Sequence, residues 1–466
     1  MKRKRTLSLT LALGLMLAGL LAACGDSTAT NAPAVTTAAS AATTAAAAAT
    51  TAAMAMSPGA AMTTAAAGAA TTAAPAATTA AAGAATTAAA TTGGNTTGVT
   101  DTEIVLGSWG PQSGPAAAYG IIDRTIDAYF KKINAEGGIN GRKIKFIFQD
   151  DGYEAAKTQN VVKKLVEQDK VFAMVGGLGT ANNLAVMDYL LQNNVPHIGP
   201  ATGSTLISKP FKKPIFALQT NYIVEATLLT RYAIETLNTK KIAIFYQDDA
   251  FGKEGLQAIT DAAKAKGQSI ATTVSYQTTD KDFGSQALKL QQSGADTVIM
   301  WSTPAPTAAI SKEMDKIGFK PTVVFSAVNN DTTLFKLSDN TIDGAWTASW
   351  LPDVTDPDNK EPKVLGFRDF MTKWAPNENA ASGFAASGYA EAQVAAEIIK
   401  RAGKDLSRES LIKAAETLQS WNEGMAYNVG YSAENRQGQN AVYFMQASAK
   451  ATRFIKKGDF LEFKPS

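Results

Sequence analysis

Short apolar runs alternate with longer amphipathic stretches along the chain after residue 102. The runs "EIVLGSW" (103–109), "KIKFIFQDD" (143–151) and "VFAMV" (171–175) are typical of buried strands. Between the first two, apolar residues recur three and four positions apart, which predicts a helix over 118–138. A second helix is expected over 154–168 and a third over 183–194, followed by the strand "VPHIGP" (195–200).

The same alternation begins again after Lys240. Four strands are predicted at 241–249, 269–276, 295–302 and 321–327, separated by helices at 252–267, 282–294 and 305–318. Apolar strands separated by amphipathic helices are typical of parallel sheets covered on both faces. We therefore predict an α/β protein of two doubly wound lobes. The last segment, 441–463, is instead expected to form antiparallel strands.

The first residues resemble an export signal. Four basic residues, Lys2 to Arg5, precede an uncharged apolar run from Leu7 to Ala23. The run is short for a membrane span, which needs about 20 apolar residues, and it ends in Leu-Ala-Ala-Cys. This ending resembles the lipobox of bacterial lipoproteins, in which the cysteine becomes the lipidated first residue. Residues 1–23 are therefore interpreted as a lipoprotein signal peptide and Cys24 as the lipidation site.

The segment after Cys24 has a different composition from the rest. Residues 24–98 are almost entirely Ala and Thr and contain no aromatic side chain. Such a segment cannot bury enough apolar surface to offset its ordering entropy, so we predict a disordered tether. Without the four basic residues of the signal, the 44 Lys and Arg fall to 40, against 41 Asp and Glu. The mature chain is thus near neutral, and nothing in its charge indicates a nucleic-acid partner.

Three loops rich in small and hydroxylic residues follow predicted strands. They are "GPQSGPAAAYG" (110–120), "GGLGTANN" (176–183) and "GPATGSTL" (199–206). In open α/β sheets ligands bind beyond the carboxyl ends of the strands, so these loops are expected to share one rim. Thr180, Thr202 and Ser204 supply hydroxyls, and the backbone N–H groups from Gly179 to Ala181 lie at a helix start. Together they would hold a carboxylate or another small anion; the alternative is simple helix capping.

Other site chemistries find little support. The dinucleotide fingerprint fails because Asn182 stands where the third glycine belongs, and no Walker A sequence is present. His197 is the only histidine and lies inside a predicted strand. The acidic pairs Asp150-Asp151 and Asp248-Asp249 are explained more simply as loop carboxylates or helix caps. We therefore predict a binding site without catalysis, cofactor or metal.

Several of these stretches resemble the leucine/isoleucine/valine-binding proteins, the type I periplasmic binding proteins of ABC importers. The resemblance rests on the first and third loops above, on "INAEGGINGRKIKFIFQDDGYEAAKT", on "YQDDAFGKEG" and on "YSAENRQGQN". It covers residues 101–466. It implies two α/β lobes joined by three crossovers, near Gln219, Thr347 and Gly430, with the ligand bound between them by hinge closure. The lobes would comprise 99–219 with 348–429, and 220–347 with 430–466.

The resemblance also implies site residues. Thr180 matches the serine that holds the ligand carboxylate, and Ala201 and Gly203 match neighbouring positions of that subsite. Gly203 replaces a family threonine, so Thr202 or Ser204 would supply that hydroxyl. Tyr119 matches the aromatic residue beside the ligand side chain, and Phe251 a second-lobe tyrosine.

The second lobe departs from the family. An acidic residue that binds the ligand ammonium is replaced in "SAVNND" by Val328, Asn329 and Asn330, and an aromatic residue is replaced near Thr303. An unpaired buried ammonium is costly, which favours a carboxylate without an amine, an amide or a urea-like solute, with Asn329 as a partner. If Asp331 or Asp248 takes the place of the missing acid and binds the ammonium, an amino acid remains a possible ligand. Trp109, Trp301 and Trp350 are expected to lie near the cleft; the alternative for each of them is packing beneath its rim.

The expected protein is thus a monomeric, extracytoplasmic receptor anchored to the cell membrane by lipid at Cys24. It would capture a small carboxylate, amide or amino-acid-like molecule and deliver it to a membrane permease. The alternative is a sensory ligand-binding protein on the same fold, which would lack a permease.

Overall fold

The computed structural model describes residues 94–462. The predicted signal peptide, Cys24 and the predicted tether up to residue 93 lie outside the described residues. Residues 94 and 95, which belong to the last part of the predicted tether, lie against the first lobe, where the Asn95 N–H donates to Glu409 Oε2 at 2.9 Å. Among the described residues, no helix has the length and apolar character needed to cross a bilayer.

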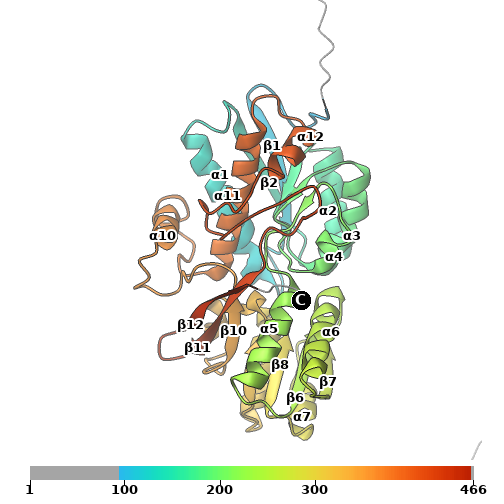
Figure 1. Cartoon of the computed structure of the whole chain (residues 1–466), viewed down its shortest axis with the longest axis vertical. Coiled ribbons are helices and arrows are strands. Elements are labelled where there is room, and N and C mark those ends of the chain that lie inside the picture. The colour runs from blue at the N-terminus through green and yellow to red at the C-terminus, as the bar shows by residue number, and fades with distance from the viewer. Residues whose placement is uncertain (1–93, 463–466) are drawn as a thin grey trace, which may run out of the picture. The chain divides into compact units, whose positions relative to one another are not determined.

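Two sheets define two lobes (Figure 1). The first lobe holds a five-stranded parallel sheet in the order β2-β1-β3-β4-β5. Its strands are β1 (Glu103–Gly110), β2 (Lys143–Asp150), β3 (Ala173–Val175), β4 (His197–Ile198) and β5 (Ile215–Phe216). Its helices are η1 (Ala117–Gly120), α1 (Ile121–Ala135), α2 (Ala155–Glu167), α3 (Thr180–Gln192), α4 (Thr205–Ser208), α11 (Gly383–Ala402) and α12 (Arg408–Ala415). The helix α10 (Pro362–Trp374) packs against α1.

The second lobe holds a seven-stranded sheet in the order β12-β11-β10-β9-β8-β6-β7. Its strands are β6 (Ile242–Gln247), β7 (Ile270–Tyr276), β8 (Thr297–Trp301), β9 (Thr322–Phe325), β10 (Trp346–Ser349), β11 (Ala441–Ser448) and β12 (Arg453–Glu462). Its helices are α5 (Tyr222–Glu235), α6 (Ala250–Ala265), α7 (Gly284–Gln292), α8 (Pro304–Lys316), η2 (Ala327–Asn329) and α9 (Thr333–Leu337). Strands β6 to β10 pair in parallel, whereas β11 and β12 are antiparallel, as the sequence predicted for the tail.

Alternate side chains of the strands enter different cores, because successive residues of a strand point to opposite faces. In β1, Leu106 packs with α1 and α11, whereas Trp109 packs with α2 and α3. In β6, Ile244 and Phe245 likewise belong to different clusters. Both faces of each sheet are therefore covered, which confirms the predicted two-lobe α/β fold.

The chain passes between the lobes three times, at 217–221, 350–361 and 430–440. The first and third passages run side by side: Ala217 N–H donates to Arg436 O at 2.9 Å, and Gly438 N–H donates to Ala217 O at 2.8 Å. Gln437 Nε2 also donates to Gln219 O at 2.6 Å. The boundaries expected near 219, 347 and 430 lie in or beside these passages.

Candidate functional site

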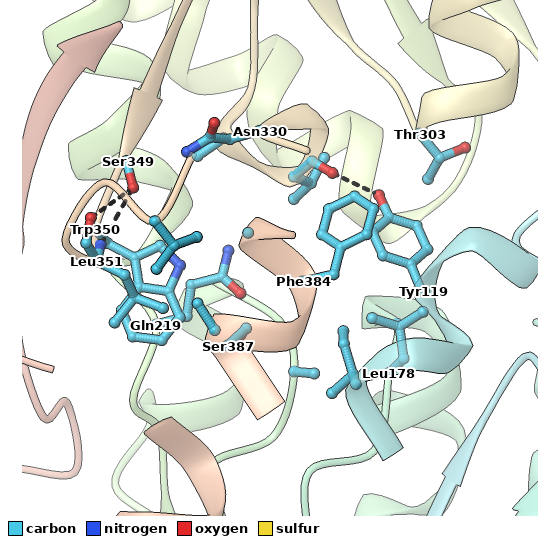
Figure 2. Close-up of a pocket in the computed structure, with 18 of the residues that line it drawn as sticks. Tyr119, Leu178, Gln219, Thr303, Asn330, Ser349, Trp350, Leu351, Phe384 and Ser387 are labelled. Atoms are coloured by element: carbon cyan, nitrogen blue, oxygen red, sulfur yellow. Dashed lines mark hydrogen bonds between the residues drawn. The ribbon is translucent and has the colours of Figure 1, made fainter. Parts of the chain in front are cut away.

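A pocket lies between the two lobes, at the carboxyl ends of their central strands. Its cavity volume is about 70 Å³, and the space not filled by protein atoms, open solvent at its mouth included, is about 840 Å³. The first lobe contributes the starts of α1, α3 and α11, and the second contributes loops that follow β6, β8, β9 and β10. In both sheets the chain reverses its winding direction at these strands, which is where doubly wound folds bind ligands. Figure 2 shows the lining residues that converge from both lobes.

The start of α3 is open toward this pocket. Gly179 occupies its N-cap position at a φ of 102°, and no side chain caps the helix. A Cβ at Gly179 would lie 2.4 Å from Asn182 Oδ1, so the loop excludes side chains both by conformation and by space. No described residue accepts a hydrogen bond from the N–H groups of Thr180 and Ala181. These donors and the helix dipole are therefore available to an anion.

A pair of hydroxyls extends this donor set. Thr180 Oγ1 and Thr202 Oγ1 lie 2.7 Å apart, and both side chains are buried. Ser204 N–H donates to Thr202 Oγ1 at 3.2 Å. If Thr202 donates to Thr180, the hydrogen of Thr180 remains free for a ligand. Thr180 lines the pocket, whereas Thr202 acts from behind it.

The second-lobe wall offers fewer donors. Phe251 lies in the first turn of α6, whose N-terminus is already capped by Asp249, which accepts from Gly252 N–H at 3.1 Å. Thr303 is the N-cap of α8, and Pro304 and Pro306 remove two N–H groups from the first turn of that helix. The open start of α3 is therefore the better place for a ligand carboxylate.

The two acids that the sequence left as partners for a ligand ammonium, Asp331 and Asp248, are bonded elsewhere. Asp331 is fully buried outside the lining: its Oδ2 accepts from Ser382 and from the Phe384 N–H, and its Oδ1 accepts from the Thr333 N–H at 2.9 Å. Asp248 pairs with Lys253 at 2.9 Å, also away from the lining. Neither therefore faces the pocket.

Asp353 is the one charged side chain among the described residues that line the pocket. Its Oδ1 accepts from the N–H and hydroxyl of Thr355, at 2.9 and 2.7 Å. Its Oδ2 is buried and faces Arg453 Nη1 at 3.9 Å. Burial raises the pKa of this carboxyl. Both oxygens are thus engaged or covered, and neither is exposed to receive an ammonium.

Two carboxyls lie buried behind the first-lobe wall. Asp123 accepts from the Ser108 hydroxyl at 2.7 Å, and burial raises its pKa to about 7. Burial raises the pKa of Glu391 well above its usual range, and the nearby Asp123 charge adds to this effect. The Glu391 carboxyl accepts from Ser387, a pocket residue, at 3.2 Å.

The chemical groups needed for catalysis do not converge here. His197 Nε2 lies 2.6 Å from Gly176 O, and burial lowers the pKa of this histidine to about 4, so that it is neutral at pH 7. Within residues 94–462, no three His, Cys, Asp or Glu side chains form a cluster that could hold a metal ion. The arrangement supports binding.

The candidate residues from the sequence fall into two groups. Six of them line the pocket: Tyr119, Gly179, Thr180, Ala201, Phe251 and Thr303. The other six lie outside its lining: Trp109, Ala181, Thr202, Gly203, Ser204 and Asn329.

Members of the second group have structural partners of their own. Trp109 is fully buried against His197, with ring centroids 5.2 Å apart. Ser204 caps α4, and Gly203 O accepts from Tyr222 N–H at 2.7 Å. Asn329 is turned inward, where its Nδ2 donates to Ser302 O at 2.7 Å.

Other lining residues were not predicted as ligand contacts. Tyr153 and Tyr222 follow β2 and the first crossover, and Phe384 and Ser387 lie in the first turns of α11. No local motif marks these positions, because they reach the pocket through packing of segments distant in sequence. Trp350 was expected near the cleft and lines it, whereas Trp301 lies behind Phe251.

Direct hydrogen bonds join the lobes around the pocket. Tyr119 Oη donates to Val328 O at 2.9 Å, and Thr205 N–H donates to Glu254 Oε1 at 2.8 Å. Tyr119, Thr180 and Phe251 are each at most 5% exposed although they line the pocket. A ligand could therefore enter or leave only if the lobes separated.

Two α/β lobes, three crossovers and an enclosed interlobe pocket without catalytic groups define a solute-binding protein of the type I periplasmic fold. In agreement, the family model for periplasmic binding proteins matches residues 103–452. The chain belongs to this family, which consists of binding proteins and not of enzymes.

Relatives and solved structures agree with this assignment. An "Amino acid binding protein" of Pseudomonas aeruginosa is 26% identical over 221 residues, which span 46% of this chain and 58% of that protein. "Leu/Ile/Val-binding protein homolog 3" of Brucella melitensis is 26% identical over 317 residues, 67% of this chain and 83% of that protein.

Among solved structures, a branched-chain amino acid ABC transporter protein from Thermus thermophilus with bound valine has a TM-score of 0.71 at 20% identity, covering 78% of this chain and 97% of that one. A fatty acid ABC transporter substrate-binding protein from Thermomonospora curvata has a TM-score of 0.72 at 21% identity, covering 80% and 95%. At these identities the structures show the shared fold.

Proposed function

We propose that this chain is the lipid-anchored, extracytoplasmic receptor of an ABC importer and that its ligand is an organic carboxylate without an α-ammonium group. The observation that carries the proposal is the open start of α3 in a pocket whose acids are all engaged or covered. A neutral amide is the second ligand that these groups could accept.

The ligand carboxylate would bind at the start of α3. One oxygen would accept from the N–H group of Thr180, and the other would accept the Thr180 hydroxyl hydrogen. Thr202 Oγ1, which lies 2.7 Å from Thr180 Oγ1 and accepts from Ser204 N–H, would support that hydroxyl by donating to it. Hydrogen bonds to a charged acceptor contribute about 1.5–3 kcal/mol each, so this set can hold an anion without a basic side chain.

Capture would proceed by hinge closure. A ligand that contacts both lobes favours the closed state by its differential affinity for that state. The bonds from Tyr119 to Val328 and from Thr205 to Glu254 exist only when the lobes meet. The closed protein would then present a joint surface of both lobes to the permease.

The anchor and the transport role rest on the chain's first residues and on its relatives. The lipobox-like ending at Cys24 supports lipidation. The relatives named above include proteins described as parts of ABC transporters. Cys24→Ser should release the protein from the membrane fraction; retention of the variant there would refute the lipid anchor.

The ligand class is tested with three matched molecules on the purified protein. Calorimetry is performed with 4-methylpentanoate, its amide, and leucine, which is the same acid with a 2-amino group. Binding of the acid, with the amide weaker and leucine weaker by at least about tenfold, is expected because an unpaired buried ammonium costs several kcal/mol. Leucine binding more tightly than 4-methylpentanoate would refute the amine-free ligand.

A further inference from the structure

The pocket continues away from the start of α3 into a region with a mainly apolar wall. Figure 2 shows Leu178, which precedes α3 in the chain, at one side of the lining and Trp350 with Leu351 at the opposite side. Between the two sides lie Gln219, Phe384 and Ser387. We name the region lined by Trp350, Leu351, Pro352 and Val354 the crossover compartment; all four residues belong to the second passage between the lobes.

Some polar groups of this region are bonded within the protein, whereas Asn330 Oδ1, also in the lining, is buried without a hydrogen-bond partner among the described residues. Ser349 Oγ donates to Leu351 O at 2.9 Å, and Thr355 Oγ1 bonds Asp353 Oδ1 at 2.7 Å. What faces the pocket from Leu351 and Val354 is therefore aliphatic surface, and Trp350 adds an aromatic ring. A polar ligand group packed against these three side chains would lose its water without gaining a partner from them.

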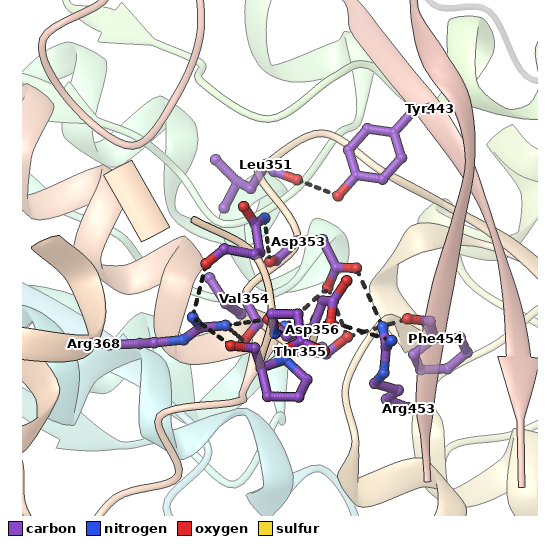
Figure 3. A network of polar contacts seen from close by, with 12 residues as sticks. Leu351, Asp353, Val354, Thr355, Asp356, Arg368, Tyr443, Arg453 and Phe454 are labelled. Atoms are coloured by element: carbon purple, nitrogen blue, oxygen red, sulfur yellow. Dashed lines mark hydrogen bonds and ion pairs between the residues drawn. The ribbon is translucent and has the colours of Figure 1, made fainter. Parts of the chain in front are cut away.

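The wall of the compartment is held in place from behind (Figure 3). Tyr443 Oη donates to Leu351 O at 2.7 Å from β11. The Arg368 guanidinium of α10 donates to Val354 O at 3.3 Å and also to Asp356 O. Arg453 of β12 pairs with Asp356 at 3.2 Å.

These contacts come from β11, β12 and α10, and they fix a segment that contains no helix or strand of its own. The compartment is thus a preformed surface and not a loop that a ligand must order. Preformed apolar surface binds matching ligands without an entropy loss for ordering the protein.

We propose that the ligand is elongated, with its carboxylate at the start of α3 and an alkyl chain or an aromatic ring that reaches the crossover compartment. The inference rests on the proposed function. It adds the length of the ligand and the residues that determine specificity for that length. Leu351 and Trp350 would then set specificity for length. A short ligand would fill only the α3 end and leave the compartment without its apolar contacts.

The test is a length series measured by calorimetry on the purified wild-type protein: butyrate, hexanoate, octanoate and 3-phenylpropionate. Each added methylene that becomes buried should tighten binding about fourfold, which is about 0.8 kcal/mol converted to affinity. Equal Kd values for butyrate and octanoate would overturn the elongated ligand and leave the carboxylate receptor standing. No binding by any acid would overturn the proposed function, and this inference with it.

Variants test whether Leu351 is responsible for the dependence of affinity on chain length. Leu351→Ala should weaken octanoate at least about tenfold and leave butyrate within about twofold, and the butyrate titration shows at the same time that the variant is folded. Leu365, an exposed leucine of α10, provides the control: Leu365→Ala should change neither Kd. If Leu351→Ala weakened the binding of both acids equally, Leu351 would not contribute to specificity for ligand length in the crossover compartment.

Arg368→Met tests the positioning of the wall, since Arg368 does not line the pocket. It should reduce the octanoate-to-butyrate ratio without altering butyrate. An unchanged ratio would show that the wall does not depend on Arg368.

Discussion

The Thr180 hydroxyl gives the sharpest test of the anion site. Replacing Thr180 with valine keeps the shape of the side chain and every backbone N–H of α3, and it removes a single hydroxyl. The variant therefore separates the contribution of the hydroxyl from that of the helix start.

The size of the effect follows from the contacts of this hydroxyl. A hydrogen bond to a charged acceptor contributes about 1.5–3 kcal/mol, so the Kd for 4-methylpentanoate should rise by about 10- to 150-fold. Stability should change less. The lost Thr180–Thr202 bond contributes about 0.5–1.5 kcal/mol, and Thr202 Oγ1 still accepts from Ser204 N–H.

The assay is calorimetric titration beside thermal unfolding, with Thr230→Val as the matched control. Thr230 is also fully buried, but its Oγ1 has no hydrogen-bond partner among the described residues, and it lies on α5 away from the pocket. The control should keep wild-type affinity and lose no stability. A change of less than about threefold in Thr180→Val, or an equal loss in Thr230→Val, would refute a carboxylate held by this hydroxyl.

Three further predictions concern stability, closure and pH. Gly255→Ala should destabilise the protein by about 1–3 kcal/mol in denaturant titration, because the added Cβ would lie 2.2 Å from the buried Trp301 ring. Gly366 is also inside a helix, but an added Cβ there would meet no atom within 4 Å, so Gly366→Ala should stabilise the protein by about 0.5–1 kcal/mol. The reverse order would contradict the packing around α6. Tyr119→Phe removes an interlobe bond, so affinity for a closing ligand should fall about 2- to 13-fold and small-angle scattering should show a more open unliganded protein; unchanged affinity and scattering would contradict this. Burial raises the pKa of Asp123 to about 7, so the folded chain retains a proton that the unfolded chain loses above pH 4. The free energy of unfolding should therefore fall as pH rises from about 4 to about 7, and Asp123→Asn should reduce that slope by up to about 1.4 kcal/mol per pH unit; an unchanged slope would contradict the buried neutral acid.

The second lobe illustrates why parts of the site could not be read from the sequence. The sequence showed that "SAVNND" lacks the expected acid, and it left Asp331 and Asp248 as substitutes. Asp331 in fact binds the start of α11, more than 50 residues further along the chain. That pairing depends on how α11 packs between the lobes, and no local pattern encodes it.

The local sequence pattern was sufficient to predict the helices and strands and the pocket residues that the first lobe contributes at the start of α3. Strand and helix periods are short-range properties, so the alternation over 103–327 predicted the α/β lobes. The loop "VGGLGTANN" likewise places its glycines and Thr180 by chain connectivity alone, since a strand that leads directly into a helix must present the helix start at the sheet edge. Gly179 and Thr180 therefore line the pocket where the sequence expected them.

By itself, the sequence determined the fold class, the export-signal pattern, the absence of a nucleotide motif and the helix start at the pocket, because each depends on residues close together in the chain. Only the tertiary structure decided which acids are engaged, that Trp109 and Asn329 are turned away from the pocket, and that the second crossover supplies an apolar wall. Those features depend on contacts such as Tyr443 with Leu351, separated by 92 positions. Contacts of that range form only when the lobes are assembled.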